Sequence, residues 1–135
     1  MAELVTLDEV RDHLMVDNSA VNPWIEMMIP AISQAVLLWL KDDWRAYETM
    51  VDSNGKPLED SAGDQFPILD SNGEPIPKPV VKAATLIEIA VQFRFRDGTD
   101  YDQTATGDLY SGRYGYILSR GPTALLHGLR RPTLT

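Results

Sequence analysis

The side chains that could carry out chemistry are few and lie scattered along the chain. The two histidines, His13 and His127, have no carboxylate at metal-ligand spacing on their own helices, so we interpret both as surface residues. The adjacent carboxylates at 42–43 and 59–60 lie in polar runs, without the apolar surroundings that a catalytic carboxylate pair needs. The chain also lacks a phosphate-binding Gly-Lys-Ser/Thr loop, a GxSxG elbow and a GxGxxG motif. We therefore predict no enzymatic activity, no cofactor and no metal site.

The middle of the chain contains an internal near-repeat. Its two copies are VDSNGKPL at 51–58 and LDSNGEPI at 69–76. Each copy holds Asn-Gly between short apolar positions, which is a strong signal for a tight turn, usually of type I′. Asp52 and Asp70 open these turns, and we favour turn formation over calcium binding because the other ligands of an EF-type loop do not follow. Since a proline follows each turn, any strands must be short or at an edge. We predict a projecting loop or β-ribbon at 49–77, a β-hairpin-like insertion.

Local signals predict a short helix at 7–15 and a long helix at 23–47. Thr6 and Glu9 form a capping box before the first helix. Asn22-Pro23 supplies an N-cap and a first-turn proline for the second. The apolar stripes that should face the core are Leu7, Val10 and Leu14 in the first helix, then Ile25, Met28, Ile29, Ile32, Val36, Trp39 and Leu40 in the second.

Two further helices are expected in the second half of the chain. Lys78-Pro79 opens a helix at 79–97. Its predicted core face is Val80, Ala84, Ile87, Val91 and Phe95. Residues 98–117 are rich in Tyr and Gly without a helical period and predict a loop. A short helix begins the basic segment at 120–135 and must pack on its own bundle or on a neighbouring subunit. The fold class is therefore a mainly α, small helical bundle that forms one domain over 1–135.

Three sequence blocks occur in an order that is similar to one known family. They are VTLDEVRDHLMVD near the start, PVVKAATLIEIAVQFRFRD at 79–97, and ILSRGPTALLHGLRRP near the end. Together they resemble the head–tail connector (neck adaptor) family of tailed bacteriophages over about two thirds of the chain. The chain departs from the family pattern at Pro30, which should kink or restart the long helix, and in its longer polar stretch at 49–77.

The resemblance implies a structural role in the virion. Such adaptors assemble into a ring below the portal, join capsid to tail and extend the DNA channel. The implied partners are further copies of the chain (a dodecameric ring in the virion), the portal protein, and the next neck or tail-completion protein. DNA would pass through the ring without specific binding. The implied location is the neck of the virion, with assembly in the host bacterial cytoplasm.

Charge divides the chain into an acidic first part and a basic second part. Residues 1–77 hold 4 Lys or Arg and 15 Asp or Glu, whereas residues 78–135 hold 8 and 5. Net acidity argues against general DNA binding, because phosphate contacts need clustered Lys and Arg. The acidic surplus could instead line a channel through which DNA slides. The absence of cysteine fits a reducing compartment, the acidic start does not resemble a signal peptide, and the apolar run at 35–40 is too short to span a membrane.

Six residues are candidates for partner binding. Tyrosines in a polar loop supply rigid contact area with a hydrogen-bonding tip, and guanidinium groups suit acidic surfaces. These residues are Tyr101, Tyr110, Tyr114, Arg120, Arg130 and Arg131. The same tyrosines beside arginines could stack on bases, so the alternative function is a small nucleic-acid-binding or DNA-packaging accessory protein.

Overall fold

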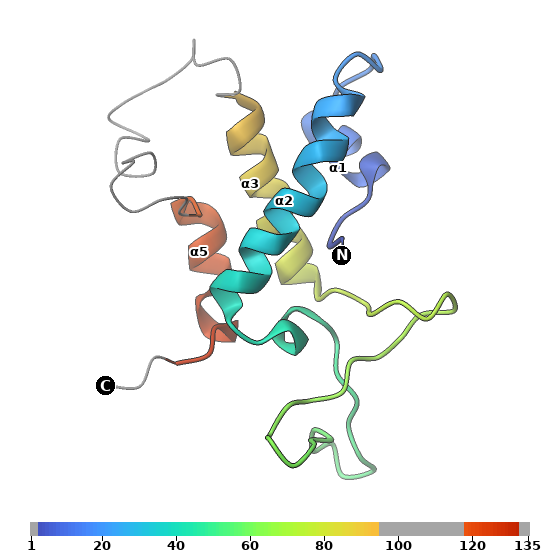
Figure 1. Cartoon of the computed structure of the whole chain (residues 1–135), viewed down its shortest axis with the longest axis vertical. Coiled ribbons are helices and arrows are strands. Elements are labelled where there is room, and N and C mark those ends of the chain that lie inside the picture. The colour runs from blue at the N-terminus through green and yellow to red at the C-terminus, as the bar shows by residue number, and fades with distance from the viewer. Residues whose placement is uncertain (1–2, 95–117, 133–135) are drawn as a thin grey trace.

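The computed structural model describes residues 3–94 and 118–132, and this part of the chain is mainly α-helical. The described residues form four α-helices that pack together, with α2 crossing the centre, α1 on one side, and α3 and α5 behind and beside it (Figure 1). The helical elements are α1 (Leu7–Leu14), α2 (Asn22–Leu40), the 3₁₀ turn η1 (Asp43–Ala46), α3 (Pro79–Arg94), α5 (Arg120–Leu126) and the 3₁₀ turn η2 (His127–Leu129). The predicted mainly α class is confirmed.

Helix α1 begins with the predicted capping box. The Glu9 backbone N–H donates to Thr6 Oγ1 at 3.2 Å, and the Thr6 N–H donates to Glu9 Oε1 at 2.9 Å. Two orphan donors at the helix start are thereby satisfied. The helix ends at Leu14, since Met15 adopts a left-handed conformation with φ of 58°.

Helix α2 differs from its prediction at both ends. Val21 is the N-cap and makes no capping side-chain bond, whereas Asn22 Oδ1 accepts a hydrogen bond from Arg11 of α1. The helix runs through Pro30, so this proline does not restart it. It ends at Leu40 rather than at residue 47, because Lys41 takes a φ of 78° and the chain turns away into η1.

The core lies mainly between α2 and its neighbours α1 and α3. The predicted α2 residues Ile25, Ile29, Ile32, Val36 and Leu40 are buried, as is Val10 of α1. By length and composition the whole of α2 is long and apolar enough to cross a membrane. The prediction that no segment could span one considered only the short run at 35–40. In this structure α2 packs against α1 and α3 with 39% of that span buried, and the core helix of a soluble protein passes the same test.

The predicted core face of α3 is wrong. Its buried residues are Val81, Ala84, Thr85, Glu88 and Ile89, so only Ala84 was correctly placed. Val80, Ile87 and Val91 are half-buried, and Phe95 lies outside the described residues. Helix α3 contacts α1, α2 and α5, and its apolar residues occur on every side. Its sequence period therefore could not select the buried face.

The segment between η1 and α3, residues 47–77, extends away from the bundle (Figure 1). It contains isolated bridges and, among the described residues, no β-strand, so the predicted β-hairpin-like insertion is not supported. Hydrogen bonds nevertheless connect its backbone segments. The Glu48 N–H donates to Ile76 O at 2.8 Å, and the Ile68 N–H donates to Glu48 O at 2.7 Å. We call residues 47–77 the projection.

Three turns of one design build the projection, one more than the near-repeat predicted. In each, an aspartate Oδ1 accepts the backbone N–H groups two and four residues later, at 2.8 to 3.0 Å. The aspartates are Asp52, Asp60 and Asp70. The turns are not of type I′, which needs positive φ at both central residues. In each only the following glycine has a positive φ, 81° at Gly55, 86° at Gly63 and 80° at Gly73.

Candidate functional site

The residues that could have carried chemistry do not converge. His13 and His127 are exposed on α1 and η2, as the sequence predicted. Asp42 is paired with arginines, and Asp60 is used in a turn of the projection. Within residues 3–94 and 118–132, no group of three or more His, Cys, Asp or Glu side chains is placed to hold a metal ion. The features that remain are surfaces and the contacts that shape them.

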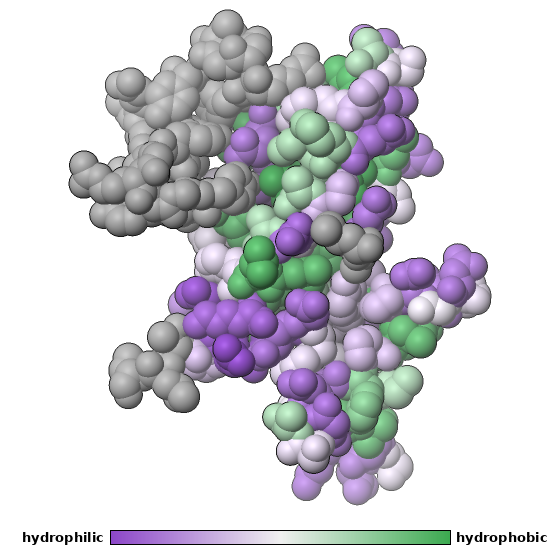
Figure 2. Space-filling view, viewed as in Figure 1, coloured by the Kyte–Doolittle hydropathy of each residue, from purple (hydrophilic) through white to green (hydrophobic). Residues whose placement is uncertain are grey.

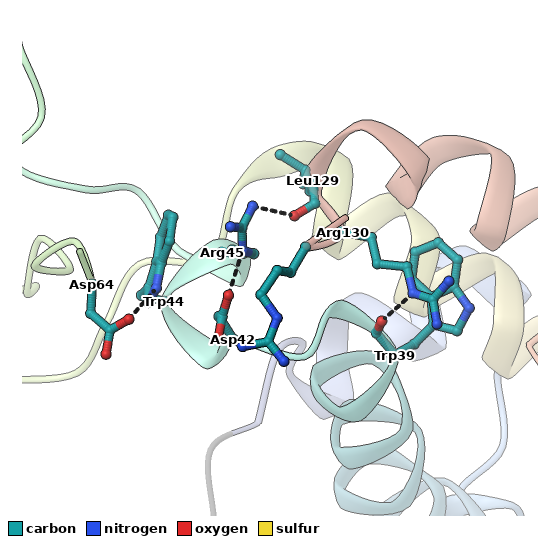
Figure 3. A network of polar contacts seen from close by, with 8 residues as sticks. Trp39, Asp42, Trp44, Arg45, Asp64, Leu129 and Arg130 are labelled. Atoms are coloured by element: carbon teal, nitrogen blue, oxygen red, sulfur yellow. Dashed lines mark hydrogen bonds and ion pairs between the residues drawn. The ribbon is translucent and has the colours of Figure 1, made fainter. Parts of the chain in front are cut away.

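Two of the predicted partner-binding arginines are bonded within the chain. Arg130 Nε donates to the Trp39 carbonyl at 2.9 Å, and its guanidinium lies over the Trp39 ring at 4.7 Å from the centroid (Figure 3). Arg131 donates from its backbone N–H to Leu40 O at 3.2 Å and from Nη1 to Asp42 Oδ1 at 3.3 Å. The basic segment thus packs on its own bundle. Its binding to a partner stays a prediction.

Arg45 of η1 extends this network toward the projection. Its Nε donates to Asp42 Oδ2 at 2.9 Å, and its Nη1 donates to Leu129 O at 3.2 Å (Figure 3). The guanidinium also lies over the Trp44 ring, whose Nε1 donates to Asp64 of the projection at 3.3 Å. These contacts connect the end of α2, the C-terminal segment and the projection. We call the contacts that Arg45, Arg130 and Arg131 make with Trp39, Leu40, Asp42, Trp44 and Leu129 the C-terminal clasp.

The other predicted partner-binding residues fall into two groups. Arg120 is the first residue of α5 and is exposed to solvent, and its binding to a partner stays a prediction. Tyr101, Tyr110 and Tyr114 lie outside the described residues. Their assignment as contact residues stays a prediction.

The base of the projection holds a buried tyrosine that the sequence placed in the long helix. Tyr47 bridges to Pro77, and the Lys78 N–H donates to Ala46 O at 2.9 Å beside it. Burial raises the pKa of Tyr47 above its usual value, and the negative charges of Asp43 and Glu74 act in the same direction. The tyrosine therefore packs in its neutral form where the projection leaves the bundle.

A groove that the sequence analysis missed runs along α2 and is bordered by Gln92 of α3 and by the C-terminal segment. It has a volume of about 930 Å³. Its lining includes Met28, Ala31, Ala35, Leu38 and Trp39 of α2, with Leu118 and Arg130. Figure 2 shows apolar surface over α2 that meets hydrophilic surface near the C-terminal segment. One signal was available, because Ala31, Ala35 and Leu38, which line the groove, are apolar yet lie off the predicted core stripe.

The projection forms a second apolar surface, of different character. Figure 2 shows hydrophobic surface on it beside strongly hydrophilic turns. Its exposed apolar residues are Met50, Val51, Leu58, Phe66, Ile68, Leu69 and Ile76. Clustered exposed apolar side chains mark interaction surfaces more often than isolated ones do. The described part of the chain thus presents a groove and a protruding apolar element.

Comparisons with known proteins give no match: no protein family model, no curated protein and no solved structure is significantly similar to this chain.

Proposed function

We propose that this chain is a structural head–tail connector subunit of a tailed phage, which assembles into a ring below the portal. The ring would join capsid to tail and extend the DNA channel. The proposal rests first on the resemblance of three ordered sequence blocks to that family. The mainly α bundle agrees with this role, although a helical bundle alone would suit many functions.

The observation that carries the proposal is the presence of two unlike apolar surfaces on one small domain, the groove on α2 and the projection. A subunit that uses two different surfaces makes heterologous contacts, and such contacts generate rings when the rotation between copies closes. The uneven charge favours the same arrangement, since an acidic first part can meet a basic second part of the next copy. Acidic surface that faces the channel would let DNA pass without binding.

The direct test is the mass of the particle in solution, measured by native mass spectrometry. The protein is measured alone and after mixing with the portal protein of the same phage. We expect a discrete large species that contains many copies, formed alone or on the portal. A protein that stays monomeric in both samples contradicts the proposed function.

The alternative, a nucleic-acid-binding accessory protein, has less support from the described surfaces. The chain is acidic overall, with 20 Asp or Glu against 12 Lys or Arg, so it offers few clustered cations for phosphate contacts. A gel-shift assay at low salt separates the two functions. Strong retention of DNA that salt abolishes would favour the alternative.

A further inference from the structure

We propose that the projection of one copy inserts into the α2 groove of the next copy, so that copies bind head to tail. The inference rests on the proposed self-assembly and deepens it by assigning the two contacting surfaces. Each surface is left uncovered by the described residues. The groove has a cationic residue at its lining, and the projection has exposed apolar side chains and carboxylates.

The groove offers an apolar floor with a cationic edge. Leu38 is 70% exposed at its rim, and Ala31 and Ala35 are small enough to let another chain approach α2 closely. Arg130 lies at its edge, held by the Trp39 carbonyl and ring. Because the guanidinium carries five N–H donors, the bond from Nε to Trp39 leaves it able to pair with an incoming carboxylate.

The projection offers apolar side chains on a backbone that is already ordered. Phe66 and Leu69 are exposed, and Leu69 is 53% accessible to solvent. The aspartate of each turn fixes its loop through two backbone hydrogen bonds, and Trp44 ties the middle turn to η1 through Asp64. A preordered element loses little conformational entropy on binding, so more of its apolar contact area contributes to affinity.

Charge selects the occupant. Residues 48–77 contain seven acidic residues and one lysine, whereas the charged residue that lines the groove is Arg130. Two facing grooves would bring like-charged arginines together, and two facing projections would bring carboxylates together. Projection against groove pairs opposite charges and covers both apolar surfaces. This is the contact between unlike surfaces that an assembly of many copies requires.

The chain contains no cysteine, so disulfide cross-linking can test the contact on the full-length protein. We would prepare Leu38→Cys at the groove and Leu69→Cys on the projection, both at exposed positions. Under mild oxidation, the mixture of the two variants should give a covalent heterodimer at twice the 15.1 kDa mass of one chain. A chain that carries both substitutions should give a ladder of higher covalent oligomers.

Met15→Cys is the matched control, because Met15 is 87% exposed and does not line the groove. Its mixture with Leu69→Cys reports the yield of random collisions. The proposal is overturned if Leu38→Cys and Leu69→Cys cross-link no better than this control. It is also overturned if Leu38→Cys pairs chiefly with itself, which would mean that two grooves face each other.

The outcome can be separated from a failure of the proposed function. The wild-type protein, which cannot form disulfides, is tested for ring or portal-bound species by mass. Large species without the cross-link would refute the groove contact and leave the connector function standing. An absence of large species would refute the connector function itself.

Discussion

Glu88 of α3 accepts two hydrogen bonds from Ser119, one from the backbone N–H at 3.0 Å and one from Oγ at 2.7 Å. Both residues are buried, and Glu88 has no solvent exposure. Ser119 is the N-cap of α5, but its hydroxyl donates to Glu88 instead of capping its own helix. The carboxylate therefore fixes the start of α5 on α3, and with it the position of the C-terminal segment.

Glu88→Met should destabilise the protein. Both Ser119 donors bond the same carboxylate oxygen, Oε2, and methionine keeps a long side chain without either oxygen, so both donors lose their acceptor. We expect a loss of about 1–3 kcal/mol in the free energy of unfolding, the typical cost of an unsatisfied buried polar group. Urea denaturation measures it. Ser119→Ala, which removes one of the two bonds, should cost less, and an unchanged Glu88→Met midpoint would contradict this role.

Arg130→Ala should loosen the C-terminal clasp. The variant loses the bond to the Trp39 carbonyl and the contact of the guanidinium with the ring, which together are worth about 1–2 kcal/mol. Arg131→Ala is the matched comparison, because its side chain is 56% exposed and its ion pair with Asp42 should contribute at most about 1 kcal/mol. Thermal unfolding compares the two variants. A larger loss from Arg131→Ala would contradict the assignment.

Glu9 should link stability to acidic pH. Burial alone would raise its pKa, but the Lys82 ammonium and the hydrogen bonds from Lys82 and Thr6 outweigh it, so the pKa lies below the usual 4.5. The stabilisation is therefore present above the unfolded-state pKa and is lost as pH falls through the folded-state pKa. Glu9→Gln keeps the capping box but loses the ion pair, which is worth about 0.5 kcal/mol at this partly exposed site. Urea midpoints of both proteins should differ at pH 7 and converge as the pH falls well below the usual pKa of 4.5. A constant difference would refute the linkage.

Tyr47 should link stability to alkaline pH. Its pKa is raised above 10.0, so the fold favours the neutral phenol. This stabilisation is complete below the unfolded-state pKa and is lost as pH rises through the folded-state pKa. Tyr47→Phe cannot ionise, so its stability relative to the wild type should increase above pH 10. Denaturation at pH 8 and at alkaline pH tests this, and parallel loss of stability in both proteins would count against it.

Gly63→Ala should destabilise the middle turn of the projection. A Cβ there meets no atom within 4 Å, so the cost comes only from the positive φ of 86° and should be about 1–2 kcal/mol. Gly128→Ala is a matched control, because a Cβ there also meets nothing and its φ is not positive. Hydrogen exchange at the Ala62 and Asp64 amides reports the local effect. Equal exchange in both variants would show that the turn is not strained.

Features set by neighbouring residues could be predicted from the sequence alone. The capping box of Thr6 and Glu9 and the turns that open at Asp52 and Asp70 each depend on contacts within a few residues. The apolar stripe of α2 also marked its buried residues correctly. The third turn could also have been found, because Asp60 and Gly63 repeat the spacing of Asp52 and Gly55. The exposed histidines followed from the absence of partners at useful spacings.

Only the tertiary structure decided which faces are buried and which surfaces remain open. The buried side of α3 depends on three neighbouring helices, and two of the donors that bond buried Glu88 come from Ser119, far along the chain. The same holds for Arg130, whose partner Trp39 lies on another helix. Helix α2 also carries apolar residues outside its core stripe, and only the packing of the other elements decided that these residues stay uncovered and line a groove. Burial is settled by long-range packing, which local periodicity does not encode when a helix is apolar all round.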